Sequence, residues 1–229
     1  MYDKLRRDVL QANQVLKKQG LVILSWGNVS GIDRDEGIIA IKPSGIPYEE
    51  LTSEKIVIVD LQGNIVDGEL KPSSDTATHL ELYKNFDNIG GVCHTHSTHA
   101  TMWAQAMHPI PCFGTTHADH FYGNVPVTES MDKEMITSDY EKNTGKAIVK
   151  CFENLNPIEM PAVLVAQHGP FTWGDSARAA VKNAVILEEI AKMAIGTKII
   201  NPDSAEIRRN LLDKHFLRKH GKNAYYGQK

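Results

Sequence analysis

The sequence lacks the features that are typical of membrane-spanning, nucleic-acid-binding and exported proteins. In 229 residues it has no apolar run near the roughly 20 residues that span a bilayer, and its net charge is only -3. A net charge this small gives no general attraction to nucleic acid or to an anionic membrane. The first residues, MYDKLRRDVLQANQVL, are charged where a signal peptide needs an apolar stretch. We therefore expect a cytoplasmic protein that binds neither nucleic acid nor membrane.

Cysteine and nucleotide-binding motifs are also scarce. The three cysteines, Cys93, Cys112 and Cys151, are widely spaced and form neither a disulfide framework nor a CxxC zinc motif. We interpret them as small buried apolar residues or free thiols. The sequence contains no GxGxxG or Walker motif, so a nucleotide-binding fold lacks its main evidence.

Helix-like and strand-like segments are mixed along the chain, without repeats or a long linker. Helices are predicted over 3–18, about 75–84, up to 106, near 130–142, from a cap at Asp175 or Ser176 to about 195, and from a capping box at 203–206 to Gly221. Strands are predicted over 21–26, 37–42, 89–96 and 161–169, with a loop at 27–31 and a hairpin over 56–69. The pattern predicts one domain over 1–229, an α/β sheet with both faces covered by helices.

Histidine is concentrated in one part of the chain, since six of the ten histidines fall between positions 94 and 120. His94 and His96 come at the end of a predicted apolar strand, where side chains at i and i+2 share one face. His168 ends a second apolar strand, directly before Gly169 and Pro170 turn the chain. Three neutral imidazoles can hold Zn²⁺ and leave a position for water or substrate; Mn²⁺, Fe²⁺ and Co²⁺ remain possible. The sequence therefore predicts a metal site of three histidines.

Residues around these histidines have more than one interpretation. Asp75 is the candidate carboxylate near the metal, or it supports the N-terminus of its helix, whose dipole favours negative charge, and the two roles are compatible. His79 lies four residues further on the same helix face, at the surface or behind the metal ligands. His99 either contacts a metal-ligating group or fills surface space, and we favour the second. His108 and His220 are not expected to be ligands.

Three predicted turns carry small polar residues. Hydroxyls and free backbone N–H groups at such turns bind phosphate well, especially beside a helix N-terminus, and a lysine adds positive charge. Each of them alone is explained as an ordinary turn, but the three together with a metal site indicate a small phosphorylated substrate. The candidate phosphate-binding residues are Gly27, Asn28, Lys42, Ser44, Gly45, Ser73 and Ser74.

Groups able to transfer protons are dense in the segment GTTHADHFYG (114–123). Asp119 is a candidate to take a proton from a metal-activated hydroxyl if its pKa is suitably tuned, or it is a loop aspartate that accepts bonds from turn amides. Tyr225 and Tyr226 lie near the chain end. They belong either to a frayed tail or to a segment that docks on a surface, for example that of another subunit.

In order along the chain, these motifs resemble those of the L-ribulose-5-phosphate 4-epimerases, a family within the class II aldolase/adducin superfamily. The family often has tyrosine at position 120 and serine at 167, where this sequence has His120 and Gln167, neither at a core functional position. The resemblance covers nearly the whole chain, through LSWGNVSGID (24–33), IKPSGIPY (41–48), KPSSDTATH (71–79), GGVCHTHSTHATMWAQA (90–106), GTTHADHFYG (114–123), QHGPFTWG (167–174) and LLDKHFLRKHGKNAYYGQ (211–228).

The resemblance implies a fold, an assembly and a cofactor. The fold is three-layer α/β/α with a mostly antiparallel central sheet, and four chains form a C4 homotetramer with active sites between subunits. One Zn²⁺ per subunit is implied at His94, His96 and His168, with Asp75 beside it or coordinating it. The substrate phosphate is implied at the turn residues given above.

The resemblance also implies a reaction, the interconversion of L-ribulose 5-phosphate and D-xylulose 5-phosphate. C4 of a 2-ketopentose bears no acidic C–H, so inversion there needs retro-aldol cleavage of C3–C4, rotation of the aldehyde and re-formation of the bond. Zinc stabilises the enediolate as a Lewis acid. Proton transfer is assigned to Asp119 and to the neighbouring subunit's Tyr226, while Glu141 and His215 match further residues of the intersubunit site.

Two alternative functions exist within the same superfamily. A class II aldolase, such as one acting on L-fuculose 1-phosphate, releases its fragments; such aldolases have glutamate where Asp75 lies and a different tail. A scaffold like the adducin head domain shares the fold but predicts loss of the ligand histidines, all of which are present. The segments KPSSD (71–75) and DKHFLRKHGKNAYYG (213–227) favour the epimerase. Degradation of L-arabinose and of L-ascorbate both use its substrate, so the pathway stays open.

Overall fold

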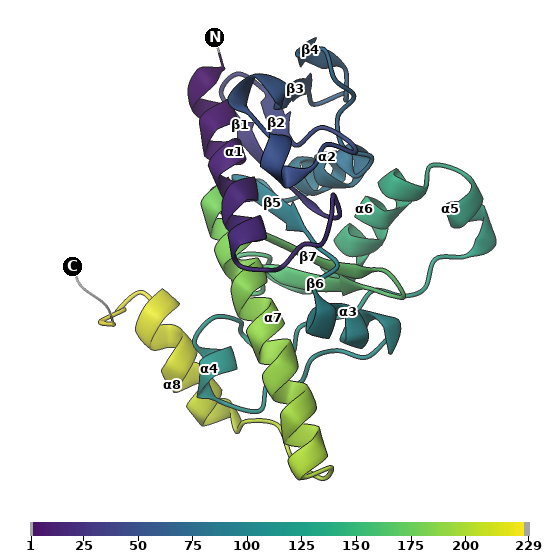
Figure 1. Ribbon diagram of the computed structural model, residues 1–229. Coiled ribbons are helices and arrows are strands. Elements are labelled where there is room, and N and C mark those ends of the chain that lie inside the picture. The colour runs from purple at the N-terminus through teal and green to yellow at the C-terminus, as the bar shows by residue number, and fades with distance from the viewer. Residues whose placement is uncertain (1, 227–229) are drawn as a thin grey trace.

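The computed structural model describes residues 2–226, in which seven strands form one sheet of order β4-β3-β2-β1-β5-β7-β6 (Figure 1). Each pair of neighbouring strands is antiparallel. The strands are β1 (Asn28–Asp33), β2 (Ile38–Ile41), β3 (Val57–Asp60), β4 (Ile65–Asp67), β5 (Gly91–His94), β6 (Ala162–Val165) and β7 (Gly169–Gly174).

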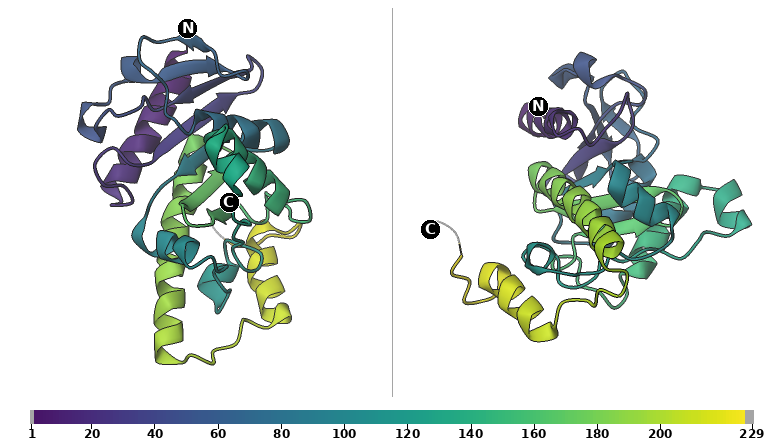
Figure 2. Two further views of the ribbon diagram at one scale, coloured as in Figure 1. Left: turned by 90° about the vertical axis from the view of Figure 1, so that its right-hand side faces the viewer. Right: turned by 60° about the horizontal axis from the view of Figure 1, so that its bottom comes forward.

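Helices cover both faces of this sheet (Figures 1 and 2). The helix α1 and the first half of α7 pack on one face, while α2 and α6 pack on the other. No helix of residues 2–226 is long and apolar enough to cross a membrane. The α-helices are α1 (Asp3–Lys18), α2 (Thr76–Asn85), α3 (Thr98–Gln105), α4 (Thr115–Ala118), α5 (Lys133–Thr137), α6 (Tyr140–Cys151), α7 (Ala177–Ile200) and α8 (Arg209–His220), with 3-10 turns at Tyr48–Glu50 and Ser53–Lys55.

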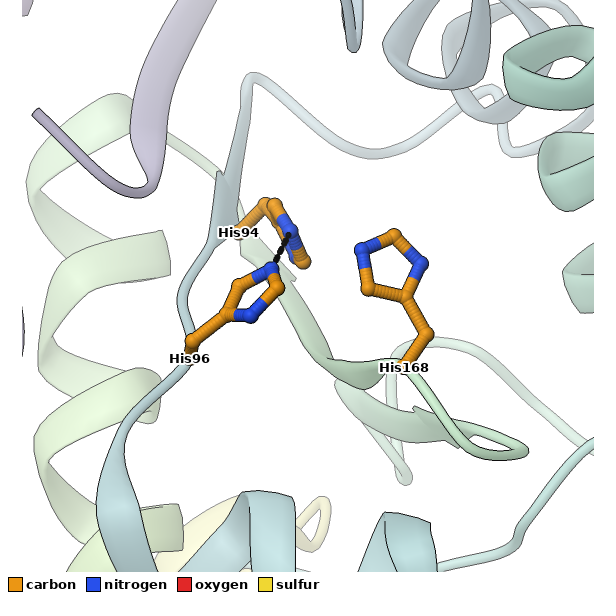
Figure 3. A group of neighbouring side chains, drawn as sticks. All are labelled: His94, His96 and His168. Atoms are coloured by element: carbon orange, nitrogen blue, oxygen red, sulfur yellow. Dashed lines mark hydrogen bonds between the residues drawn. The ribbon is translucent and has the colours of Figure 1, made fainter.

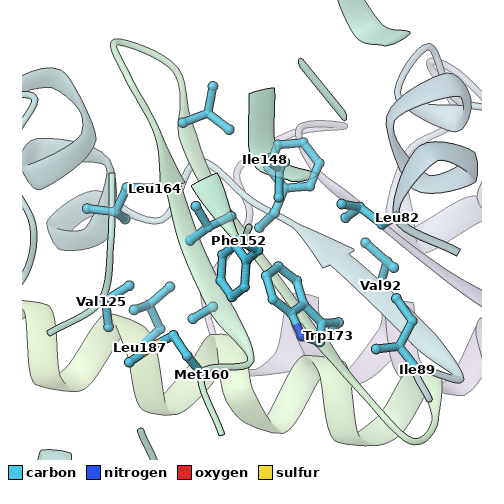
Figure 4. Packing of buried hydrophobic residues seen from close by; sticks show 14 of the residues in the cluster. Leu82, Ile89, Val92, Val125, Ile148, Phe152, Met160, Leu164, Trp173 and Leu187 are labelled. Carbon is cyan, nitrogen blue, oxygen red and sulfur yellow. The ribbon is translucent and has the colours of Figure 1, made fainter. Parts of the chain in front are cut away.

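Alternate residues of one strand enter opposite cores. In β2, Ile39 belongs to the core beneath α2 and α6, while Ile38 and Ala40 belong to the core beneath α1. Both faces of the strand are buried, which explains why its sequence is continuously apolar. In the larger core, the ring of Trp173 packs against that of Phe152, with centroids 5.0 Å apart (Figure 4), and Phe86 lies 5.2 Å from Trp173 and 5.5 Å from Phe152. The predicted α/β/α layering with an antiparallel sheet is thus confirmed.

Two local predictions about the start of the sheet were wrong. Residues 21–26 form no strand, and β1 begins inside the segment predicted as a loop. The side chain of Asn13 explains the start of β1, because its Oδ1 accepts from the Val29 N–H at 3.1 Å and its Nδ2 donates to the Val29 carbonyl at 3.2 Å. Leu21 and Val22 enter the core, but the chain then turns outward: Leu24 has a φ of 54° and is 68% exposed.

Other element boundaries also differ from the predictions. The strand predicted over 89–96 ends at His94, and the one predicted over 161–169 ends at Val165. The helix predicted near 130–142 is two helices, α5 and α6. The last helix begins at Arg209 rather than at the predicted capping box (203–206), although it ends before Gly221 as expected. The helices over 3–18 and 75–84 are confirmed within one or two residues, and α7 extends to Ile200.

Candidate metal and phosphate site

Three histidines from the ends of neighbouring strands meet at one point (Figure 3). His94 is the last residue of β5, His96 lies between β5 and α3, and His168 lies in the turn between β6 and β7. Their ring centroids are 4.8–5.0 Å apart, and one nitrogen of each lies within 4.8 Å of the others. The predicted grouping is therefore present, although His96 lies beyond the strand rather than on its face.

Hydrogen bonds orient two of the three rings. The Nδ1–H of His94 donates to the Pro170 carbonyl at 3.0 Å, and the ring stacks on Phe171 with centroids 4.1 Å apart. Donation from Nδ1 fixes the tautomer and leaves a lone pair on Nε2 of His94. The Tyr140 hydroxyl shares a hydrogen bond with Nδ1 of His168 at 3.2 Å. Such outer hydrogen bonds are typical of histidines that ligate metals.

The donor set fits a divalent metal ion. Burial, together with the neighbouring His94 and His96, lowers the pKa of His168 to about 4, and burial also lowers the pKa of His96. Both rings are neutral at pH 7, the form that binds metal. The Nε2 atoms of His94 and His96 lie 3.1 Å apart. Two ligands at 2.0–2.1 Å on a tetrahedral ion are about 3.3 Å apart, so a cation fits between them.

Asp75 lies beside this triad but outside it. It precedes α2, makes no side-chain cap bond, and its Oδ2 accepts a hydrogen bond from Asn28 Nδ2 at 2.6 Å. Burial favours the neutral carboxyl, but His94, His79, Asn28 and His168 outweigh it and keep the pKa of Asp75 below its usual value. Asp75 is therefore a carboxylate close enough to influence the triad, and its coordination of metal stays a prediction.

Asn28 and His79 surround the same carboxylate. Asn28 pairs with His94 across β1 and β5, and its buried Oδ1 has no hydrogen-bond partner among residues 2–226. His79 is fully buried, so the alternative that placed it on the helix surface was wrong. Its Nδ1 shares a hydrogen bond with Ser30 Oγ at 2.7 Å, and the same hydroxyl lies 2.8 Å from the Tyr83 hydroxyl. A buried polar network thus lies behind the triad.

The three predicted phosphate turns come together in space. Ser44 N–H donates to the Lys71 carbonyl and Ser73 N–H donates to the Lys42 carbonyl, both at 3.0 Å, which joins two of the turns. The third turn contains Gly27, whose carbonyl accepts from the Tyr48 hydroxyl at 2.9 Å. Its φ is +78°, and a Cβ there would lie 2.7 Å from the His94 carbonyl oxygen. Only glycine lets this turn lie against the metal-binding strand.

Exposure differs among the phosphate-binding candidates. Ser44, Gly45 and Ser74 are exposed, whereas Ser73 is buried. The side chain of Lys42 is buried as well, with Nζ 5.0 Å from the Tyr48 ring centroid. Burial lowers the pKa of Lys42 to about 8. The exposed hydroxyls and the Gly45 turn can therefore meet an anion directly, while the lysine adds charge from below.

The predicted proton-transfer residues form a second group within this chain. Asp119 ends α4, and its carboxylate accepts bonds from His215 Nδ1 at 3.0 Å and from Arg218 and Lys219 of α8. The Tyr226 ring lies under the same cations, 4.8 Å from the Arg218 guanidinium carbon. The helices α4 and α8 pack together away from the strand ends that carry the metal triad (Figure 1). One chain thus holds two groups rather than one complete site.

The remaining candidates are placed as follows. Glu141 is the second residue of α6, directly after Tyr140, and its carbonyl accepts a hydrogen bond from the Thr78 hydroxyl. His99 is half-buried and bonded to Glu188 of α7, so neither of its predicted roles was right. His108 and His220 are exposed and lie outside the triad. The cysteines are free, with Cys93 and Cys112 buried and Cys151 half-buried, as interpreted.

Sequence reasoning missed several residues that contact the predicted site. Tyr140, Glu188, Arg218 and Lys219 each bond to a predicted residue that is 28 to 100 positions away in the sequence. Nothing in their local sequence marks them, apart from the position of two of them within the resembling segment 211–228.

Comparison with known proteins agrees with this arrangement. Residues 7–195 match the family model described as class II aldolase and adducin N-terminal domain. A solved L-fuculose 1-phosphate aldolase is 27% identical, with a TM-score of 0.79, over 93% of this chain and 94% of that chain. YgbL from Klebsiella pneumoniae, whose name leaves open an aldolase, an epimerase or a decarboxylase, is 27% identical with a TM-score of 0.73, over 92% and 97%. L-fuculose 1-phosphate aldolase from Glaciozyma antarctica is 16% identical, with a TM-score of 0.78 over 97% and 84%, and shows the fold alone.

Proposed function

The chain belongs to the class II aldolase and adducin N-terminal domain family, and on that basis we propose that it interconverts L-ribulose 5-phosphate and D-xylulose 5-phosphate with a bound Zn²⁺. One observation carries the proposal. The three grouped histidines lie directly beside the turn at Gly27 and Asn28, so a metal site and an anion site adjoin. A sugar phosphate with two oxygens near its carbonyl spans such a pair of sites.

The reaction breaks and re-forms C3–C4 of the substrate. A base removes the C4 hydroxyl proton, the C3–C4 electron pair stays on the three-carbon fragment, and glycolaldehyde phosphate forms. When bound, a divalent cation supplies Lewis-acid stabilisation of the negative charge left on that fragment. The turns at Ser44, Gly45 and Ser73 retain the phosphate while the aldehyde group rotates. Re-addition then returns a proton to the oxygen from the opposite side.

The two groups of residues are complementary parts of one site. The metal triad and phosphate turns of one subunit have Asp75, Tyr48 and Tyr140 as titratable hydrogen-bond partners, and none of these is a proton carrier assigned by the resemblance. Asp119, His215 and Tyr226 form a separate cluster on α4 and α8. We place that cluster, together with Glu141, in a site shared between subunits of a C4 homotetramer. Each site then receives its metal ligands from one chain and at least Tyr226 from the next.

Product analysis tests the proposal. Purified protein with Zn²⁺ is incubated with L-ribulose 5-phosphate, and D-xylulose 5-phosphate and glycolaldehyde phosphate are quantified before and after chelation. We expect D-xylulose 5-phosphate to form, to stop after chelation and to return when Zn²⁺ is restored. Accumulation of glycolaldehyde phosphate without D-xylulose 5-phosphate would refute epimerisation.

The likeness to L-fuculose 1-phosphate aldolase supports a second candidate, an aldolase that releases its fragments. The same triad and turns would serve it. Incubation with L-fuculose 1-phosphate separates the two functions, because only the aldolase releases dihydroxyacetone phosphate from that substrate. A scaffold without activity fits less well, since the three histidines are both present and grouped.

A further inference from the structure

We infer that Glu188 of α7 is a positioning residue for the metal ligand His96, acting through the first turn of α3. This inference rests on the metal site of the proposed function and adds a residue that lies outside both groups described above. Its basis is the difference between His96 and the other two ligands.

His96 lacks the outer support that the other rings have. Nδ1 of His94 is held by the Pro170 carbonyl and Nδ1 of His168 by the Tyr140 hydroxyl. Within residues 2–226, His96 makes one side-chain hydrogen bond, through Nε2 to His94 (Figure 3), and it is the most exposed of the three histidines. That Nε2 faces the position of the metal, so the bond orients the His96 ring only toward His94 and not toward the surrounding protein. The placement of His96 therefore depends on its backbone.

That backbone is fixed at both ends. On one side, His94 belongs to β5, which is paired with β1 and β7. On the other side, α3 begins at Thr98, two residues after His96. Its N-cap residue, Ser97, makes no side-chain cap bond to the helix. The free N–H groups of the first turn of α3 must therefore be satisfied from elsewhere.

Glu188 satisfies them from another helix. Its Oε1 accepts from the His99 N–H at 2.9 Å, and its Oε2 accepts from the Ala100 N–H at 3.0 Å. His99 Nδ1 lies 2.7 Å from the same Oε1, which gives the carboxylate a third contact. The Glu188 side chain is only 16% exposed. A carboxylate at a helix N-terminus is favoured by the dipole as well as by these bonds.

The consequence reaches the metal site through a very short segment. Thr95 is buried and its N–H bonds to the Pro170 carbonyl, so only residues 96 and 97 link this fixed point to the start of α3. If the first turn of α3 loosens, His96 gains freedom that only the bond between its Nε2 and His94 opposes. The His96 ring is then less ordered in the metal-free protein. The affinity for zinc falls because binding must restore that order.

Zinc affinity of the metal-free protein, measured by competition with a chromophoric chelator, tests the inference. We expect Glu188→Ala to raise the zinc dissociation constant 10- to 100-fold, the range for loss of an outer partner of a metal ligand. Glu188→Gln should recover part of this affinity, because the amide oxygen still accepts one N–H bond. The matched control is Glu189→Gln, the adjacent exposed glutamate of α7, which should bind zinc as the wild type does.

A double-mutant cycle separates positioning from general stability. Glu188→Gln is also made in a His96→Ala background, where the positioned ligand is gone. We expect the effect of Glu188→Gln on zinc affinity to disappear there, because interacting residues are non-additive. An equal loss in both backgrounds, or unchanged affinity in Glu188→Ala with a folded circular-dichroism spectrum, would overturn the inference. If wild-type protein binds zinc but none of these variants differs, only this inference fails; if wild-type protein binds none, the proposed function fails with it.

Discussion

Arg218 holds the carboxylate of Asp119 with two nitrogens, Nη2 at 2.9 Å from Oδ2 and Nε at 3.2 Å from Oδ1. Burial favours a neutral Asp119, but the bonds from Arg218, His215 and Lys219 outweigh it and lower the pKa of the carboxyl. Within one chain Asp119 is therefore ionised, whereas a base tuned to neutral pH would have a raised pKa. The base role proposed for Asp119 therefore requires contacts with substrate or with a second subunit that raise its pKa.

Replacement of Asp119 should separate catalysis from metal binding. We expect Asp119→Asn to lower epimerase activity by about 10²- to 10⁴-fold, as for loss of one proton-transfer group. Zinc content should stay normal, because the bonds to the Asp119 carboxylate come from α8 and not from the triad. Metal analysis and product assays on the same sample check this, and loss of zinc in the variant would contradict the assigned role.

Mixing two inactive variants tests whether sites are shared. His96→Asn removes a metal ligand and Tyr226→Phe removes a proton carrier, so each pure oligomer should be inactive. After subunit exchange at equal amounts, a site that takes these parts from different chains has both intact in about one case in four. We expect activity to return toward about a quarter of the wild-type value. Exchange shown by mass spectrometry without any recovery would argue against a shared site.

The buried ammonium of Lys42 predicts a pH dependence. Its pKa of about 8 lies below the ordinary 10.5, so the protonated form that attracts phosphate is lost as pH rises through about 8. We expect KM for the sugar phosphate to rise above that pH in the wild type. Lys42→Arg keeps its charge throughout this range and should show no such rise, since the guanidinium titrates only above pH about 12. Parallel KM profiles in the two proteins would exclude Lys42 from phosphate binding.

Two glycines with similar φ values offer a stability test. Gly27 (φ +78°) would place a Cβ 2.7 Å from the His94 carbonyl oxygen, whereas Gly45 (φ +70°) has nothing within 4 Å. Gly45→Ala should cost about 1–2 kcal/mol, the penalty of left-handed backbone. Gly27→Ala should cost more, because the backbone of β5 must also move, and it should weaken zinc binding. Urea unfolding of the metal-free proteins measures both, and equal losses would show that the close approach to His94 is unimportant.

Metal removal should affect stability as well as activity. If zinc binds the folded chain and not the unfolded one, zinc at 100 times its dissociation constant stabilises the protein by about 2.7 kcal/mol. We expect chelation to lower the unfolding temperature and restored Zn²⁺ to raise it again. His168→Ala should abolish most of this difference, and a zinc-induced shift that persists in that variant would place the ion elsewhere.

Much of the metal site could be predicted because its ligands mark the ends of apolar strands. His94 and His168 each follow a run of buried residues, and β5 pairs with β7, so the two strand ends meet. His96 does not lie on the strand as predicted, since β5 stops at His94, yet the short link to α3 still brings its ring to the same point. Strand ends are visible in sequence, whereas the residue at which pairing stops depends on neighbours.

The residues that orient these ligands could not be predicted locally. Tyr140 and Glu188 lie on helices whose own patterns are explained by packing, and only the fold brings them to His168 and His99. The outward turn at Leu24 could not be predicted for the same reason. An apolar run predicts a strand, but the contact with Asn13 of α1 decides where β1 begins. Contacts between distant segments decided each of these cases.

The metal triad also has a consequence for how the chain comes apart. His94 and His168 lie at the two ends of a long segment of the chain that contains α3, α4, α5, α6 and β6. A cation bound to both residues would therefore act as a reversible cross-link between the two ends of that segment. A protease should cleave the ion-free protein first within this segment. Metal binding should slow that cleavage, even though most of the segment contains no metal ligand.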